Sequence, residues 1–258
     1  MGLRIFSYAV IAIVIAPMLV IIATSFTTAS YLSFPPIGFT LKWYEVALRK
    51  TEFLDSFYFS LRVAVAAAIV ATILGALVAI VLTRFRVPGR AVIDAFFMSP
   101  LVLPTIVIGI ALLQYLSRLH APMTTEILVL GHVVITTPYV IRLVTASLAG
   151  IDLTCERAAR NLGAHPVRAF WEVTFPLITP GLGGGATFAF ITSFDNVTIS
   201  VFLATPSRIA LPVRIFNLWD QPIEPWLIAI CAMVIVFTVV LIALIERTIG
   251  VRGVLGRT

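Results

Sequence analysis

The chain is poor in charged residues. Asp, Glu, Lys and Arg make up 12% of its 258 residues, whereas a soluble domain carries roughly 25%. So few charges cannot cover a globular surface, and hydrophobic residues reach 60% with a mean hydropathy of +1.08. The composition excludes an ordinary soluble protein and indicates that lipid is the solvent for much of the chain.

Cysteine and histidine are also scarce, with two and three residues respectively. We expect Cys155 on the cytoplasmic side of a membrane and Cys231 within a span, so the two cannot pair. The sequence holds no CxxC pair and no Cys/His cluster that would suggest a metal site. We therefore expect the chain itself to bind no metal and no other cofactor.

Catalytic motifs are missing as well. Neither HExxH nor GxSxG occurs, and Ser193 with Asp195 has no His nearby in the sequence to act as a base. The chain contains no GxxxxGKS or GxxxxGKT loop for the phosphates of ATP, so we expect that it does not hydrolyse ATP itself. These gaps argue against a membrane enzyme.

Secondary transporters and channels are disfavoured too. His132 lacks the series of Asp, Glu and His partners found in a proton relay, and we interpret it as a hydrogen-bonded contact between helices. The second half of the chain does not resemble the first in inverted topology. The sequence has neither a carbonyl-filter motif nor an acidic cluster that could form a ring in a pore.

The net charge of +6 raises the question of nucleic acid binding. The Arg residues are spread over short loops between apolar segments, and no basic stripe with interleaved aromatic residues is present. We therefore expect no nucleic acid partner and interpret the positive charge as a determinant of membrane topology.

Six apolar segments are long enough to cross a hydrocarbon core of about 30 Å, which takes about 20 helical residues. The first is too long for the apolar region of a secretory signal and has no small-residue cleavage site, so we expect an anchor. The sequence predicts an all-α polytopic membrane protein with a single domain, 1–258. Its six transmembrane helices are expected near 5–26, 59–83, 91–114, 125–147, 177–202 and 226–246.

Basic residues in the loops predict the orientation. Ten fall in the loops that are cytoplasmic if the chain starts inside, and six fall in the external ones. Both termini are therefore expected in the cytoplasm. The cytoplasmic set comprises Arg4, Arg84, Arg86, Arg90, Arg157, Arg160, Arg168, Arg247, Arg252 and Arg257.

A polar island, residues 156–164, lies in the expected cytoplasmic loop near 149–175. Its composition favours a short helix, Ala158 and Ala159 give that helix a flat surface, and Gly163 offers a left-handed stop. Pro166 can open a second short helix. A short helix with small residues suits a groove on another protein, and an ordinary amphipathic helix at the membrane interface is the alternative.

The island resembles a family motif. The run from Arg157-Ala158-Ala159 to Gly163, followed by Phe175-Pro176, is similar to the EAA loop of bacterial ABC importer permeases, in which the pattern is Glu-Ala-Ala, three residues and Gly, followed by Leu-Pro. Here the Glu position is occupied by Arg157, while Glu156 lies one residue earlier. If that Glu pairs with a basic group on the ATPase, Glu156 or another pairing has to substitute.

Further segments resemble one branch of the family. The run Ser193-Phe194-Asp195-Asn196 is similar to the second, C-type permease of spermidine/putrescine importers. Polyamine permeases often carry an acid where this chain has Leu101. Relatives for thiamine, ferric ion, phosphonate or another amine share the architecture, so they stay as alternatives. The other matching residues are Phe39, Lys42, Trp43, Tyr44, Met98, Ser99, Pro100, Ser200, Leu211, Pro212 and Ile215.

The resemblance implies a MetI-like permease of the bacterial inner membrane, with a homologous permease as its partner in a heterodimer. It further implies two cytoplasmic ATPase subunits that bind ATP and Mg, and a periplasmic binding protein that delivers the substrate. The loop would act as a lever that moves with the ATPases. The implied coupling residues are Glu156, Arg157, Ala158, Ala159, Gly163 and Pro176.

Asp195 is the residue that we single out within the membrane. It lies 18 residues after Leu177, or about 27 Å along a helix, which places it in the outer half of its span. With Ser193, Asn196 and a cation–π surface on Trp43, it could line the pathway of a polycation. The alternatives are structural: an ion pair for Asp195 with the partner permease, and a place in the interfacial aromatic belt for Trp43.

Overall fold

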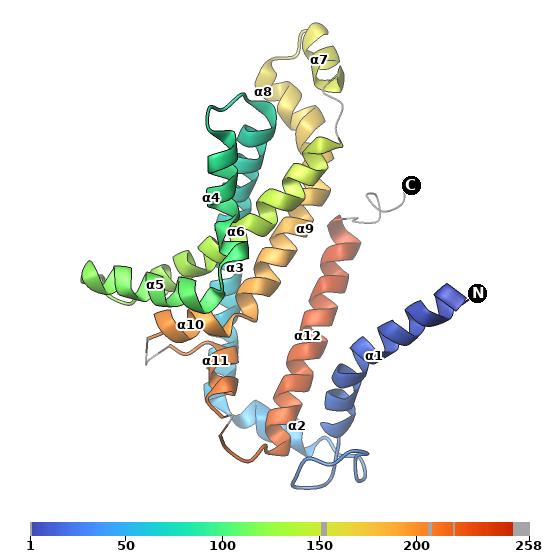
Figure 1. The fold of residues 1–258 in the computed structure, drawn as a ribbon. Helices are drawn as coiled ribbons and strands as arrows, with labels where there is room; N and C mark the ends of the chain where they lie inside the picture. Colours follow the sequence, from blue (N-terminus) through green and yellow to red (C-terminus); the bar gives the residue numbers. More distant parts are fainter. Residues whose placement is uncertain (1, 151–153, 206–207, 219, 250–258) are drawn as a thin grey trace. The chain divides into compact units, whose positions relative to one another are not determined.

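The computed structural model describes residues 2–150, 154–205, 208–218 and 220–249 (Figure 1). Arg252 and Arg257 of the expected cytoplasmic set lie outside the described residues, as do residues 151–153 of the expected loop. The described part of the chain is helical and contains no strand. In chain order its elements are α1 (Gly2–Thr24), α2 (Lys42–Arg49), α3 (Thr51–Arg84), α4 (Arg90–Val102), α5 (Thr105–Arg118), α6 (Thr125–Ala149), α7 (Thr154–Asn161), α8 (Pro166–Ala169), the π-helical turn η1 (Phe170–Thr174), α9 (Phe175–Phe194), α10 (Val197–Leu203), α11 (Leu211–Phe216) and α12 (Pro225–Ile249).

Within the described ranges, five helices are long and apolar enough to cross a membrane. They are α1, α3, α6, the continuous helix Pro166–Phe194 formed by α8, η1 and α9, and α12. The pair α4 and α5 passes the same test together but is bent by 107°. The all-α membrane fold is therefore confirmed, with six crossings if the bent pair counts as one.

The bend divides the single span expected near 91–114 into two helices. The helix stops at Leu103 and Pro104, whose ψ angles of 139° and 131° are extended. Proline has no N–H to donate to the preceding turn, and its ring pushes the residue before it out of the helical region. Pro100 stays inside α4, so only the second of the two prolines breaks the helix.

The span expected near 177–202 also differs from the structure at both ends. The helix begins earlier, at Pro166, because α8 and η1 continue into α9 without a break. It ends at Phe194, and α10 starts separately at Val197. The side-chain oxygen of Asn196 accepts a hydrogen bond of 2.7 Å from the Ile199 N–H, which satisfies one of the free donors at the start of α10.

The chain divides into two compact units. The first unit comprises residues 1–58 and 213–241, and the second unit comprises residues 59–212 and 242–258. Within the first unit, aromatic pairs pack the start of α3 against α12. The ring centroids of Phe53 and Trp226 are 5.2 Å apart, and those of Phe57 and Phe237 are 5.1 Å apart.

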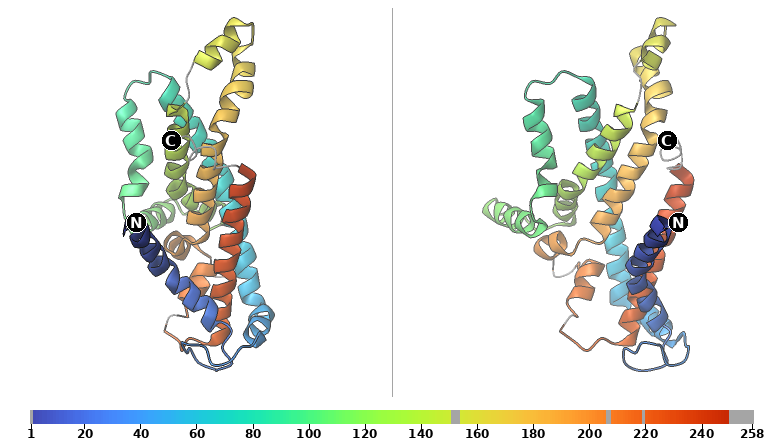
Figure 2. Two further views of the ribbon diagram at one scale, coloured as in Figure 1. Left: turned by 90° about the vertical axis from the view of Figure 1, so that its right-hand side faces the viewer. Right: turned by 45° about the vertical axis from the view of Figure 1, so that its right-hand side comes forward.

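The second unit is built around α6. Helix α9 packs along α6, and the two lie side by side in both views of Figure 2. Two glycines of α9, Gly181 and Gly185, allow the backbones to approach closely. A Cβ on Gly185 would lie 3.0 Å from the Cα of Val140. Small residues four apart are a common way for membrane helices to pack, because they bring the two backbones within van der Waals reach.

A buried polar contact joins three helices of the second unit. His132 of α6 lies 2.8 Å from the Ser193 hydroxyl through Nδ1 and 3.1 Å from the Ser200 hydroxyl through Nε2. All three side chains are buried. Because a buried polar group without a partner is costly, this arrangement satisfies the ring and ties α6 to α9 and α10. The expectation of a hydrogen-bonded helix contact at His132 is confirmed.

Candidate functional site

Residues 156–161 of the polar island lie in α7, and the C-terminal end of this helix has the geometry of a Schellman motif. Gly163 adopts a φ of +94°. Its N–H donates to the Arg160 carbonyl at 3.0 Å, and the Ala164 N–H donates to the Ala159 carbonyl at 3.1 Å. These two bonds satisfy carbonyls at the helix end, and they require a left-handed residue that glycine supplies without strain. The predicted left-handed stop at Gly163 is confirmed.

The turn after Gly163 leads directly into the next helix. Pro166 occupies the first turn of α8, and a ring nitrogen of His165 accepts a hydrogen bond of 3.4 Å from the Val167 N–H. Proline is suited to this place because the N–H that it lacks has no partner in a first helical turn. The second short helix expected at Pro166 is therefore present, and it continues without interruption into α9.

The sides of α7 differ in charge. Arg157, Ala158 and Arg160 are exposed, and Ala159 is half-buried. Leu162, just past the helix, is 90% exposed. Glu156 faces inward, with a side chain only 19% exposed. Because successive residues of a helix are about 100° apart, Glu156 and Arg157 point to different sides. The outward face of α7 is therefore basic.

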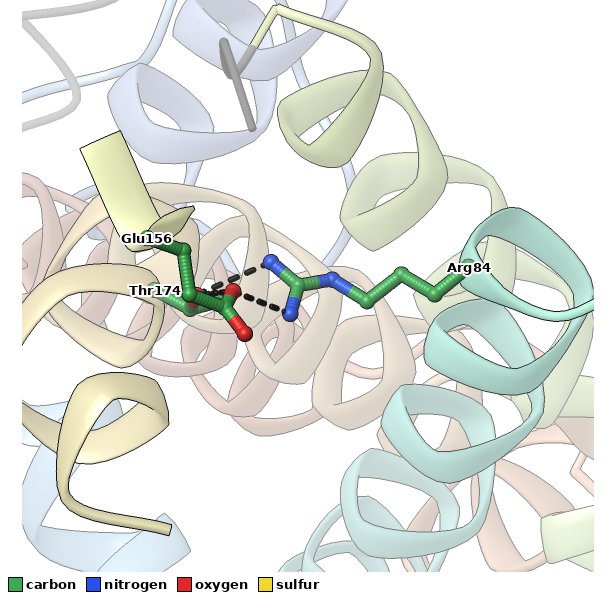
Figure 3. A network of polar contacts seen from close by, with 3 residues as sticks. All are labelled: Arg84, Glu156 and Thr174. Carbon is green, nitrogen blue, oxygen red and sulfur yellow. Dashed lines mark hydrogen bonds and ion pairs between the residues drawn. The ribbon is translucent and has the colours of Figure 1, made fainter. Parts of the chain in front are cut away.

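Glu156 belongs to a closed triangle of polar contacts, shown in Figure 3. One terminal nitrogen of Arg84 donates to the Glu156 carboxylate at 2.5 Å, and the other donates to the Thr174 hydroxyl at 2.8 Å. That hydroxyl in turn donates to the same carboxylate oxygen of Glu156 at 2.7 Å. The triangle thus joins the end of α3, the start of α7 and the residue that precedes α9.

The triangle sets the protonation of Glu156. Burial by itself would raise the pKa of the Glu156 carboxyl, but the hydrogen bonds from Thr174 and Arg84, with the nearby positive charges, outweigh burial. The pKa of Glu156 is therefore held below its ordinary value. At neutral pH the group is a carboxylate, which is the form that accepts both bonds.

The π-helical turn η1 carries Thr174 into this contact. The Phe175 N–H bonds to the carbonyl of Phe170, five residues earlier, which is the wider spacing of a π turn. Thr174 is the last residue of η1 and is fully buried. The sequence reasoning did not single out Arg84 or Thr174 for this role. Arg84 and Glu156 are 72 positions apart, and their opposite charges on one expected side of the membrane were the only available indication.

Three of the expected pathway residues lie at the end of α9, and their side chains have different surroundings. Ser193 is buried and bonded to His132, and Asn196 caps α10. Asp195 is exposed, and its carboxylate makes no hydrogen bond or ion pair with any other described residue. Of these three side chains, Asp195 is the exposed one, and its carboxylate is available to a ligand or to another subunit.

Trp43 belongs to α2 in the first unit, whereas the other three residues belong to the second unit. Its indole N–H donates to the Thr27 carbonyl at 2.8 Å. The ammonium of Lys42 lies 5.1 Å from the centroid of the Trp43 ring, within the usual range of a cation–π contact. The cation–π partner of Trp43 in this structure is thus a residue of the chain itself.

The fold is that of a membrane protein with an exposed polar helix between two spans. Residues 71–249 match the family described as "Binding-protein-dependent transport system inner membrane component". The chain therefore belongs to this family of ABC importer permeases.

Individual relatives agree with the family. The spermidine/putrescine transport system permease protein PotC of Escherichia coli K12 is 28% identical over 237 residues, which cover 92% of this chain and 89% of the relative. The putrescine transport system permease protein PotI of the same strain is 31% identical over 227 residues, covering 85% and 80%.

A solved structure shares the fold. It is the crystal structure of a bacterial ABC transporter that imports the acidic polysaccharide alginate, with a TM-score of 0.74 and 17% identity. The match covers 95% of this chain and 94% of the other. At this identity the likeness speaks for the architecture alone.

Proposed function

We propose that this chain is the permease through which an ATP-driven importer moves polyamines, putrescine or spermidine, into the cell. Two permeases named for these substrates match 85% or more of the chain, and this likeness is the observation that carries the proposal. We place the chain in the bacterial inner membrane with both termini in the cytoplasm, beside a second, homologous permease.

Asp195 supplies chemistry that fits such a substrate. Polyamines are flexible polycations, and an exposed carboxylate without a partner among the described residues can accept charge-assisted hydrogen bonds from an ammonium group. A carboxylate at membrane depth is costly unless it is paired or faces water. A substrate pathway that contains water would remove this cost. Ser193 and Asn196 then shape the break between α9 and α10 through the bonds described above.

Leu101 favours a different substrate. It is 37% exposed and apolar, at a position where the resemblance to polyamine permeases leads us to expect an acid. A pathway with Asp195 but without a second carboxylate there is a weaker site for a multivalent cation and leaves room for a shorter amine or another substrate. Thiamine, ferric ion and phosphonate stay as alternatives because their permeases share the architecture. This alternative leaves the importer intact and changes only the cargo.

We further propose that α7 docks on one of two cytoplasmic ATPase subunits, which bind ATP and Mg. Ala158, Ala159 and Leu162 would give the helix a small apolar contact surface, and the stop at Gly163 would set its angle to α8. Because α8, η1 and α9 form one continuous helix, a movement of α7 passes into a helix that spans the membrane. Pro176, in the first turn of α9, closes the coupling segment.

The charge of the docking face suggests the character of the groove that receives it. Arg157 and Arg160 are exposed on α7, whereas Glu156 is committed to Arg84 and Thr174. Complementary potentials favour correct association and disfavour wrong partners. We therefore expect an acidic residue on the ATPase opposite Arg157.

The test is the ATPase activity of the reconstituted complex with its binding protein loaded in turn with putrescine, spermidine, thiamine or ferric ion. Stimulation by a polyamine alone supports the substrate proposal. Stimulation by one of the other ligands supports the importer proposal and contradicts the polyamine proposal. A permease that retains no ATPase on purification contradicts the proposed docking role of α7.

A further inference from the structure

We propose that Arg84, Glu156 and Thr174 form a latch that positions α7 within the permease, so that Glu156 serves coupling from inside the chain and does not contact the ATPase. The latch rests on the proposed docking of α7. It adds to that docking the means by which the helix is held against the membrane-spanning part of the second unit.

The first step is that apolar burial does not hold α7 in place. None of its residues is buried, so apolar packing contributes little to its placement. A helix of eight residues is also too short to be stable alone in water. Its position therefore depends on polar contacts and on the turn at Gly163. Glu156 provides an ion pair with Arg84 and accepts a hydrogen bond from Thr174, and both of these partners are shielded.

The second step is the shielding of that ion pair. The Arg84 side chain is 13% exposed, the Glu156 side chain is 19% exposed, and Thr174 is fully buried. Exposed ion pairs contribute little to stability because water and salt screen them. A shielded pair behaves differently, because removing one partner leaves the other charge without compensation. The loss of Arg84 or of Glu156 alone is therefore costly.

The third step is the place of each charge on its helix. Arg84 is the last residue of α3, and Glu156 lies in the first turn of α7. A cation is favoured at the negative C-terminal end of a helix, and an anion is favoured at the positive N-terminal end. Each charge therefore stabilises the end of its own helix, and the pair links those two ends directly (Figure 3).

The fourth step is what the latch joins. Through Thr174 it reaches η1, directly before α9, and through Arg84 it reaches α3. A force on α7 would then act at two points of the second unit, one on each spanning helix, in addition to the covalent connection through α8. A displacement of α7 is therefore transmitted more directly than it would be through the turn at Gly163 alone.

The experiment uses the complete complex with cysteine-free partner subunits and Cys231→Ser, reconstituted into liposomes. Cys155 is exposed and next to Glu156, so a nitroxide on it reports the motion of α7. We compare Glu156→Gln and Arg84→Gln with a matched control, Glu172→Gln. Glu172 forms an exposed ion pair with Arg168 nearby. The second readout is uptake of labelled putrescine or spermidine per ATP hydrolysed.

If the latch is correct, both latch variants release the nitroxide into faster motion and lower uptake per ATP by about fivefold or more, the low end of ordinary coupling free energies. All subunits still co-purify in the latch variants. The Glu172→Gln control has the same nitroxide motion and the same uptake per ATP as the unchanged chain. The charge exchange Arg84→Glu with Glu156→Arg restores part of the lost coupling, because it rebuilds the ion pair although each charge then lies at the less favourable end of its helix.

Two results overturn the latch. One is an unchanged nitroxide spectrum in both latch variants. The other is a loss of ATPase co-purification in Glu156→Gln with a normal Arg84→Gln, since Glu156 would then contact the ATPase. If the unchanged chain retains no ATPase at all, the proposed docking fails instead, and the nitroxide spectra of the permease still decide whether the latch exists.

Discussion

Gly181 of α9 faces Ser147 of α6 so closely that a Cβ on the glycine would lie 2.3 Å from the serine hydroxyl oxygen and 2.8 Å from the Leu143 carbonyl oxygen. The hydroxyl could rotate away, but the carbonyl belongs to the helix backbone and cannot. The two central helices of the second unit are therefore packed at a distance that only glycine permits.

We expect Gly181→Ala to push α9 away from α6 and to lower the stability of the permease by about 1–3 kcal/mol, the usual cost of overpacking. The measurement is thermal unfolding in detergent. Gly184→Ala is the matched control, because a Cβ there meets only Leu143 Cδ1 at 3.7 Å, an ordinary contact. Equal melting temperatures for the two variants would contradict the close packing.

Gly163→Leu should weaken coupling without preventing insertion into the membrane. Apart from its two chain neighbours, nothing lies within 4 Å of a Cβ placed at Gly163, so the cost comes from the φ of +94°. A left-handed conformation costs a β-carbon residue about 1–2 kcal/mol. We expect uptake per ATP to fall severalfold and expression to stay normal. Gly163→Asn, which tolerates this conformation better, should retain most of the coupling. A normal ratio in Gly163→Leu would argue against the lever.

Asp195→Asn tests the pathway. If the carboxylate binds an ammonium group, loss of its charge removes a bond of the stronger, ionic kind, and we expect the transport rate at low substrate to fall about tenfold. The uptake rate is measured against substrate concentration. Asp94→Asn, an exposed carboxylate elsewhere in the chain, serves as the control. Unchanged uptake in Asp195→Asn assigns the residue to a structural role.

The pH dependence of α7 follows from Glu156. Its pKa is lowered in the folded protein, so the stability that it contributes is present above the ordinary carboxyl pKa, about 4.3, and is lost as pH falls through the lower folded value. A nitroxide on Cys155 should therefore stay unchanged between neutral pH and about pH 5 and gain motion only in stronger acid. Glu156→Gln should abolish that dependence. A transition near neutrality would mean that another group controls α7.

Arg157→Glu should weaken the binding of the ATPase, because it reverses the charge of the exposed face of α7. Charges at the rim of an interface act mainly on association rate and salt dependence. We expect a loss of roughly fivefold in affinity at low salt that shrinks as salt is added. Arg168→Ala is the control, since Arg168 already pairs with Glu172. Tighter binding by Arg157→Glu would mean that the groove is basic.

Features that depend on neighbouring residues could be predicted from the sequence. The short helix of the polar island, its stop at Gly163 and the new start at Pro166 follow from local backbone chemistry, and the structure contains all three. Long apolar runs likewise predicted the spanning helices. The span expected near 91–114 did not anticipate the break at Pro104, and the direction of the 107° turn there depends on what α5 packs against.

The polar triangle could not be predicted in the same way. Arg84 and Thr174 are 90 positions apart, and nothing local distinguishes Arg84 from Arg86 or Arg90. Thr174 reaches the carboxylate from a π turn, which shifts the register of side chains by one residue and has no clear sequence pattern. The contact becomes visible only when three helices are placed together.

The absence of buried residues in α7 has a consequence for how such transporters diverge. Residues 157–162 can change without loss of packing, because their side chains contribute little to the interior. The inward contact of Glu156 can meanwhile remain as it is. We therefore expect this short stretch to determine which ATPase the permease recognises. Grafting it from one importer to another should change the ATPase that binds and leave the rest of the permease as stable as before.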